Sequence, residues 1–107
     1  MKHTAAHIIK ATYESEELKL YAVNTRPIYD QITAAAEYFA KKLRKGIFDE
    51  VKAVDRLYPV ATAAAKKYCR EFGGLYYQMF DVTARYTCAA ELARAAQERA
   101  LELLEEA

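Results

Sequence analysis

Glycine, proline and serine are scarce in this 107-residue chain, which holds three glycines, two prolines and a single serine. Strands need turn residues every few positions, so this scarcity argues against a β-sheet. About half of the residues are hydrophobic, and many of these are Ala or Tyr. We therefore predict an all-α helical bundle, with one domain over residues 1–107 that buries its own core without disulfides or metals.

Long hydrophobic runs are also missing. No stretch approaches the roughly 18 consecutive apolar residues that a membrane span requires. The start of the chain, MKHTAAHIIKATYESEE, has no hydrophobic segment followed by a small-residue cleavage site. We therefore expect a cytoplasmic protein that does not associate with membranes.

The residue sets that catalysis commonly uses are absent as well. Ser15 is the sole serine, no glycine-rich phosphate loop is present, and adjacent carboxylates fall at expected helix starts or on the C-terminal tail. His3 and His7 stand one helical turn apart, a spacing that lets two imidazoles share a metal ion, but no third ligand accompanies them. The sequence therefore predicts no enzyme, no cofactor and no metal site.

The two cysteines, Cys69 and Cys88, lie inside helical patterns and have no CxxC spacing. The sequence allows a disulfide between them. In a cytosolic chain, however, two cysteines more often stay reduced and pack as small buried apolar residues. We expect this second arrangement.

Residues 46–74 hold the clearest helical pattern, and we expect every other segment to pack against this helix. Gly46 ends the preceding helix, Asp49 is a candidate N-cap, and Gly73–Gly74 can end the helix in a left-handed conformation. Pro59 either kinks or splits the helix, and the continuous phase of the apolar residues favours a kink. These apolar residues recur at helical spacing and are Val51, Val54, Leu57, Tyr58, Ala61, Ala64, Ala65, Tyr68 and Phe72.

A second long helix is predicted at about 25–45. Asn24 and Thr25 are both good N-caps, and Pro27 is tolerated in a first helical turn. Only a short connection separates this helix from the one at about 49–72. The two should therefore be antiparallel neighbours.

The two ends of the chain are also predicted to be helical. In segment 1–23, Ser15 is placed to cap a second helix start, which begins either a short helix or the second half of one long helix. We expect one or two short helices in this segment. Asp81 is the expected cap of a last helix at about 81–105, which carries a coiled-coil-like spacing of four and three. The seam consists of Val82, Tyr86, Ala89, Ala93, Ala96, Ala100 and Leu103. Its alanines permit close approach, either to the central helix or to a second copy of the chain in a homodimer.

Charge is distributed unevenly although the net charge is only +1, because residues 41–70 hold nine basic and three acidic residues. This asymmetry fits a contact with nucleic acid or an acidic protein, or packing of the acidic C-terminal helix against the basic middle. The candidate nucleic-acid contacts are Lys41, Lys42, Arg44, Lys45, Lys66, Lys67 and Arg70. They fall at the C-terminal ends of two successive antiparallel helices. We therefore expect two clusters at opposite ends of the pair, which weakens the case for one continuous phosphate-binding stripe.

Tyrosine is unusually frequent, with nine copies, and aromatic residues are dense between Gly74 and Asp81. This connector either closes the open end of the bundle or presents an interaction patch to a partner. The candidate partner-binding residues are Tyr76, Tyr77, Met79 and Phe80.

Several short patterns share a resemblance. They are Asn-Thr at 24–25, Tyr-Asp at 29–30, KGIFD at 45–49, KAV at 52–54, AKKY at 65–68 and EFG at 71–73. Together they resemble small uncharacterised helical proteins encoded by bacteriophages and integrated mobile elements, over roughly residues 18–92. Pro59 departs from that pattern, in which a helix-forming residue is expected. The resemblance implies a genomic setting and carries no catalytic residues.

We therefore expect a non-enzymatic protein–protein interaction module, encoded by a phage or mobile element, that binds and modulates a host protein. The alternative is a small nucleic-acid-binding protein that uses the basic 41–70 region.

Overall fold

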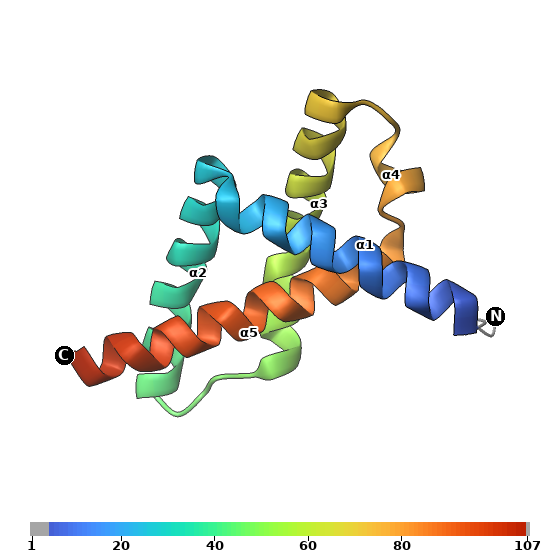
Figure 1. The fold of residues 1–107 in the computed structure, drawn as a ribbon. Helices are drawn as coiled ribbons and strands as arrows, with labels where there is room; N and C mark the ends of the chain where they lie inside the picture. Colours follow the sequence, from blue (N-terminus) through green and yellow to red (C-terminus); the bar gives the residue numbers. More distant parts are fainter. Residues whose placement is uncertain (1–4, 107) are drawn as a thin grey trace.

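The computed structural model describes residues 5–106, with side chains from residue 12 onward, and these residues form helices without any strand (Figure 1). The all-α prediction is confirmed. The helices are α1 (Ala5–Asn24), α2 (Arg26–Arg44), α3 (Glu50–Phe72), α4 (Tyr76–Met79) and α5 (Val82–Glu106).

Helix α5 holds the bundle together. Figure 1 shows α2 and α3 running in opposite directions, with α5 crossing both. Helix α3 contacts every other helix, as the sequence predicts, but α1 and α2 each pack more extensively against α5 than against α3. The expected antiparallel pair is therefore present, and each of its members is packed chiefly on α5.

The alanine seam of α5 lies inside the chain's own core. Ala89, Ala93, Ala96 and Ala100 are buried, whereas the first two predicted positions, Val82 and Tyr86, are exposed. The buried positions in the first turns of α5 are instead Ala84, Arg85, Cys88 and Leu92. Because helices of this chain cover the four alanines, a homodimer through them would require the bundle to open.

Helix α1 is continuous, so the prediction that Ser15 caps a second helix start is wrong. Ser15 is buried, and its hydroxyl donates to the backbone carbonyl of Thr12 at 2.8 Å. A buried hydroxyl can meet its hydrogen-bonding need on the preceding turn of its own helix, so the residue needs no helix start.

The chain turns at Asn24 and Thr25, where the sequence predicts a break. Their side chains complete the end of α1: the Thr25 hydroxyl donates to the Tyr21 carbonyl at 2.6 Å, and the Asn24 amide donates to the Leu20 carbonyl at 2.8 Å. Thr25 occupies the N-cap position of α2 without a side-chain capping bond. The two residues therefore satisfy the last carbonyls of one helix and not the first N–H groups of the next.

The turn between α2 and α3 follows the predicted caps. Gly46 has φ +73°, and its N–H donates to the Leu43 carbonyl, while the Ile47 N–H donates to the Lys42 carbonyl. This pair of bonds is a Schellman motif. Asp49 then caps α3, because one of its carboxylate oxygens accepts from the backbone N–H groups of residues 51 and 52 at 2.9 and 3.2 Å.

Helix α3 is one helix from Glu50 to Phe72 with Pro59 inside it, so the chain does not split there. At its C-terminal end Gly73 has φ +91° and ψ +168°, a positive φ with an extended ψ in place of the expected left-handed helical turn. The Gly73 N–H still donates to the Cys69 carbonyl at 2.8 Å.

The core face of α3 is predicted correctly in the middle and wrongly at its ends. Val51 and Phe72 are 72% and 64% exposed because they lie at the tips of the helix. Cys69 belongs to the core instead. The buried residues of α3 are Ala53, Leu57, Val60, Ala61, Ala64, Ala65 and Cys69.

Both cysteines are free and buried, as expected. Burial raises the pKa of the Cys88 thiol to about 12.

Candidate functional site

The aromatic connector divides into a part that closes the core and a part that faces outward. Phe80 is only 1% exposed and packs edge-on against Tyr68, with ring centroids 5.1 Å apart. Tyr77 and Met79 are 53% and 37% exposed, and Tyr76 is half-buried between these extremes. Phe80 is therefore buried, and we remove it from the candidate partner-binding residues. Phe80 helps to close the core, whereas Tyr77 and Met79 face solvent.

Among the side chains of residues 12–106, Arg85 is the one buried cation, with 8% exposure. Its Nε donates to the Phe80 carbonyl at 3.0 Å, and its Nη1 donates to the Thr62 hydroxyl at 3.1 Å. The guanidinium also lies 5.5 Å from the ring centroid of Tyr58 and 5.4 Å from that of Tyr76. Within residues 12–106, no carboxylate forms an ion pair with it. Neutral acceptors and two ring faces therefore solvate this charge.

The rings around Arg85 continue to the surface. Tyr86 stacks on Tyr58, with centroids 4.1 Å apart and an interplanar angle of 20°. Tyr76, the other ring near Arg85, packs edge-on against Tyr77, with centroids 5.5 Å apart. Tyr86 is 43% exposed. We name this connected set the tyrosine patch, and its members are Tyr58, Tyr76, Tyr77, Arg85 and Tyr86.

The tyrosine patch combines residues from α3, α4 and α5, so a prediction from the connector alone misses three of its five members. The sequence does show that Tyr58 and Tyr86 are aromatic, but their periodicity suggests core positions. Arg85 looks like any other helical arginine in the sequence. Only the crossing of α5 over α3 brings these residues together. Lys66, a candidate nucleic-acid contact, also places its ammonium 5.1 Å from the Tyr76 ring centroid.

The seven candidate nucleic-acid residues fall into two separate groups, as expected. One group lies at the C-terminal end of α2, at 41–45, and the other lies in the last two turns of α3, at 66–70. The C-terminal ends of α2 and α3 lie at opposite ends of the antiparallel pair (Figure 1). The two groups therefore belong to opposite ends of the helix pair and not to one continuous stripe.

Within residues 12–106, no acidic residue of α5 forms an ion pair with a basic residue of the 41–70 region. Glu91 pairs with Lys19 of α1 at 3.5 Å and with Arg94 of its own helix at 3.2 Å. Glu102 and Glu106 both pair with Arg99. The idea that the charge asymmetry serves internal pairing between α5 and residues 41–70 thus gains no support.

A small pocket lies at the turn between α2 and α3, with a volume of about 310 Å³. We name it the turn pocket. Its lining residues are Tyr38, Phe39, Lys42, Ile47, Phe48, Asp49, Lys52, Ala53 and Arg56. The sequence analysis included Lys42 among its candidates but missed Lys52 and Arg56, because the first turns of α3 come back beside the end of α2 only in the folded chain.

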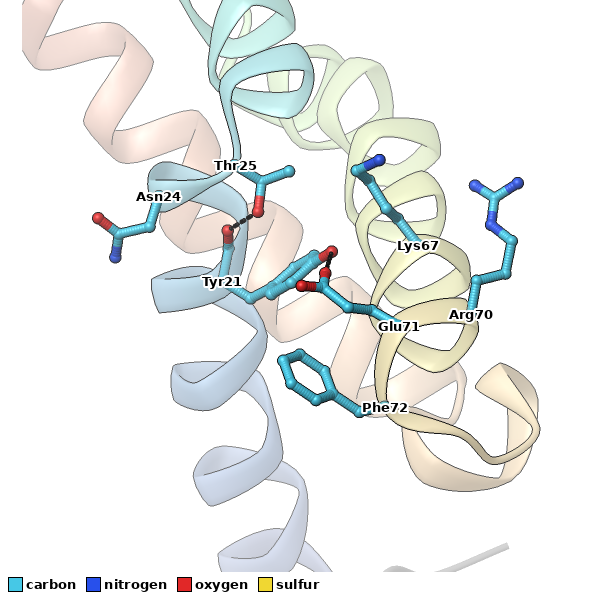
Figure 2. A pocket seen from close by; sticks show the side chains of 7 residues that line it. All are labelled: Tyr21, Asn24, Thr25, Lys67, Arg70, Glu71 and Phe72. Atoms are coloured by element: carbon cyan, nitrogen blue, oxygen red, sulfur yellow. Dashed lines mark hydrogen bonds between the residues drawn. The ribbon is translucent and has the colours of Figure 1, made fainter.

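A larger and shallower pocket of about 800 Å³ lies between the C-terminal ends of α1 and α3. Figure 2 shows its main polar contact, in which the Tyr21 hydroxyl meets the Glu71 carboxylate while the Arg70 side chain extends away. The hydrogen bond measures 2.7 Å. Tyr68 makes a second such bond, donating to Glu17 at 2.7 Å. These contacts join α1 to α3, so we interpret this region as a structural contact between the two helices.

The same contacts alter the two tyrosines. Burial, followed by the hydrogen bond to Glu71, raises the pKa of Tyr21. The hydrogen bond to Glu17, followed by burial, raises the pKa of Tyr68. In both cases the ionised phenol would face a carboxylate, so the neutral, donating form is favoured.

The two histidines whose spacing would let them share a metal ion are His3 and His7. His3 and the side chain of His7 lie outside the described part of the chain. Among the described residues, no group of three His, Cys, Asp or Glu side chains is placed to hold a metal ion. Within this same range, none of the helices combines the length and apolar character needed to cross a membrane.

Comparisons with protein-family models, with curated protein sequences and with solved structures found no match to this chain.

Proposed function

We propose that this protein is a non-enzymatic protein–protein interaction module that binds its partner through the tyrosine patch. The observation that carries the proposal is the continuous chain of ring contacts that runs from exposed Tyr86 to exposed Tyr77 by way of Arg85. Tyr and Arg are the residue types, together with Trp, that contribute most to binding at protein interfaces.

The patch is ordered before any partner arrives. Arg85 is fixed by two hydrogen bonds, and its guanidinium lies against two of the tyrosine rings. Side chains that are already held in place lose little conformational entropy on binding, which favours affinity. The exposed edges of Tyr77 and Tyr86 are the parts that a partner would cover.

A partner from a bacterial host, modulated by a phage or mobile-element protein, remains part of this proposal. It rests on the sequence resemblance described above. The nucleic-acid alternative has less support, because its seven candidate residues belong to two separate helix ends.

The test is capture of a partner by tagged protein from host lysate, with and without nuclease treatment. The informative variant is Tyr77→Ala with Tyr86→Ala. The matched control is Tyr13→Ala with Tyr29→Ala, which also removes two exposed tyrosines, on α1 and α2. We expect a protein that survives nuclease, is retained by the control and is lost by the patch variant.

Two results would count against the proposal. Equal capture by the two double variants would remove the tyrosine patch from partner binding. Recovery of nucleic acid, with all captured proteins lost after nuclease, would replace the proposal with the nucleic-acid alternative.

A further inference from the structure

The turn pocket gathers three cations around an apolar floor. Phe39 and Ala53, buried in the core, form part of its lining, and Phe48 packs against Phe39 with ring centroids 5.3 Å apart. Lys42, Lys52 and Arg56 supply the positive charge. The pocket thus presents apolar rings and cationic side chains to the same small volume.

Arg56 is held in a defined orientation. Its guanidinium lies 3.8 Å from the ring centroid of Tyr38, and the ammonium of Lys42 lies 5.2 Å from the same ring. A guanidinium stacked on a ring keeps its N–H edge available, and that edge matches two oxygens of a phosphate or carboxylate. Tyr38 therefore positions Arg56 to bind an oxyanion.

The three cations have no anionic partner in the described part of the chain. No ion pair or side-chain hydrogen bond is recorded for Lys42, Lys52 or Arg56, whereas Arg26, Arg94 and Arg99 each pair with a carboxylate. Within residues 12–106, ion pairs are likewise missing for Lys41, Arg44, Lys45, Lys66, Lys67 and Arg70. Lys42, Lys52 and Arg56 differ from these cations because all three line the same small pocket.

Among the described residues, Asp49 is the only carboxylate that lines the turn pocket, and one of its oxygens already accepts two backbone N–H groups as the cap of α3. With three cations and one carboxylate, the lining carries a net charge of +2. A dianion balances this charge, whereas a single carboxylate would leave an excess. The charge count therefore favours a phosphate monoester.

The volume of the turn pocket limits the size of the ligand beyond its phosphate group. About 310 Å³ lies at the lower end of the range for small-molecule sites, which is roughly 300–1,000 Å³. This leaves room for one phosphate and one ring or group of similar size. A ring would contact Phe48 and Ile47, while the phosphate meets the cations.

We propose that the turn pocket binds a small phosphate monoester that carries a ring, with the phosphate held by Lys42, Lys52 and Arg56. The proposal does not depend on the tyrosine patch, since the two sites share no residue. A free small molecule is favoured over a phosphate within a nucleic acid, because the cations line a small pocket and not an extended stripe.

The experiment is an NMR titration of the ¹⁵N-labelled full chain with phenyl phosphate, inorganic phosphate and a short DNA duplex. We expect phenyl phosphate to bind with a millimolar or lower dissociation constant and to shift backbone amides of residues 38–56. Inorganic phosphate should bind more weakly, because it lacks the ring.

Two charge variants test the cations, and a third serves as the control. Arg56→Gln and Lys52→Gln should each weaken phenyl phosphate by about tenfold, which corresponds to roughly 1.4 kcal/mol. Arg44→Gln removes the same charge at the end of α2 but does not line the pocket, and it should leave binding within about twofold of the wild type. All of these side chains are exposed, and the amide spectrum of each variant reports whether it is folded.

The same data can overturn the proposal. No shift with millimolar phenyl phosphate, equal losses in Arg44→Gln and Arg56→Gln, or shifts centred outside residues 38–56 would each exclude the site. Equal affinity for inorganic phosphate and phenyl phosphate would show that the ring does not contribute to binding. Tighter binding of the DNA duplex at these residues would assign the pocket to nucleic acid.

Discussion

Tyr21 on α1 and Glu71 on α3 are joined by a 2.7 Å hydrogen bond from hydroxyl to carboxylate. One turn away the roles of the two helices are exchanged, because Tyr68 on α3 donates to Glu17 on α1. The two tyrosine rings also meet edge to face, with centroids 5.2 Å apart. We refer to these four residues as the α1–α3 clamp. The clamp fixes the first helix against the third at a point where sequence periodicity shows only a Tyr and a Glu on each helix.

Removal of the clamp hydroxyls should destabilise the protein. Tyr21→Phe and Tyr68→Phe each delete one hydrogen bond while keeping the ring, so we expect a loss of about 0.5–1.5 kcal/mol for each variant. Urea unfolding followed by circular dichroism measures this loss. Tyr13→Phe, at a residue that is 72% exposed, is the control and should stay within about 0.5 kcal/mol of the wild type.

The clamp should also make stability depend on alkaline pH. The pKa values of Tyr21 and Tyr68 are raised in the folded chain above the ordinary value of 10.0. Below that value both phenols are neutral whether the chain is folded or unfolded, and the contribution of the clamp is fully present. As the pH rises through the raised folded values, the unfolded chain loses these protons first, so this contribution is lost.

The measurement is the free energy of unfolding at a series of pH values from neutral to alkaline. The wild type should lose more stability above the ordinary tyrosine pKa than Tyr21→Phe with Tyr68→Phe. Other tyrosines and lysines titrate in both proteins, so only the difference between them tests the clamp. Parallel curves for the two proteins would contradict the raised pKa values.

Arg85 should contribute both to stability and to the order of the tyrosine patch. Arg85→Met keeps much of the length of the side chain but leaves the Phe80 carbonyl and the Thr62 hydroxyl without this donor. We expect a loss of about 1–3 kcal/mol, since a buried acceptor loses its partner. The near-ultraviolet circular dichroism of the tyrosines should weaken as well. An unchanged spectrum would show that Arg85 does not fix the rings.

Gly74 and Gly46 provide a matched pair for steric crowding. Both have positive φ, +98° and +73°, so alanine is strained at either position by about 1–2 kcal/mol. At Gly74 an added Cβ would also collide with the Met79 sulfur, whereas at Gly46 it would meet nothing within 4 Å. Gly74→Ala should therefore lower the thermal midpoint more than Gly46→Ala. The reverse order would show that Met79 moves aside without cost.

Local signals in the sequence predict the ends of several helices. The Asp49 carboxylate caps α3, and that of Asp81 caps α5 by accepting the Ala84 N–H at 2.9 Å. Gly46 closes α2 as predicted. These features depend on residues within one or two turns of each other, so the sequence contains all the necessary information. Ser15 is the exception, because a serine that is a good cap can also be buried inside a helix.

The candidate sites are less predictable, because they depend on how helices cross. Tyr58 and Tyr86 form a stacked pair although 28 positions separate them in the chain. Lys52 and Arg56 join Lys42 at the turn pocket only once α3 has folded back along α2. The face of α5 that turns inward also follows from its contacts with three helices at once. Because most of the small residues of α5 are alanine, helical periodicity alone does not show which of two adjacent faces of this helix turns inward.

The alanines of α5 also set a limit on how this protein can change during evolution. Ala89, Ala96 and Ala100 are essentially inaccessible to solvent, on a helix that packs against α1, α2 and α3. A larger side chain at any of these positions would push neighbouring helices apart, which typically costs about 1–3 kcal/mol. Homologues are therefore expected to keep small residues at this spacing long after their surface residues have diverged. This would make the size pattern of the last helix a more durable family signature than any surface motif.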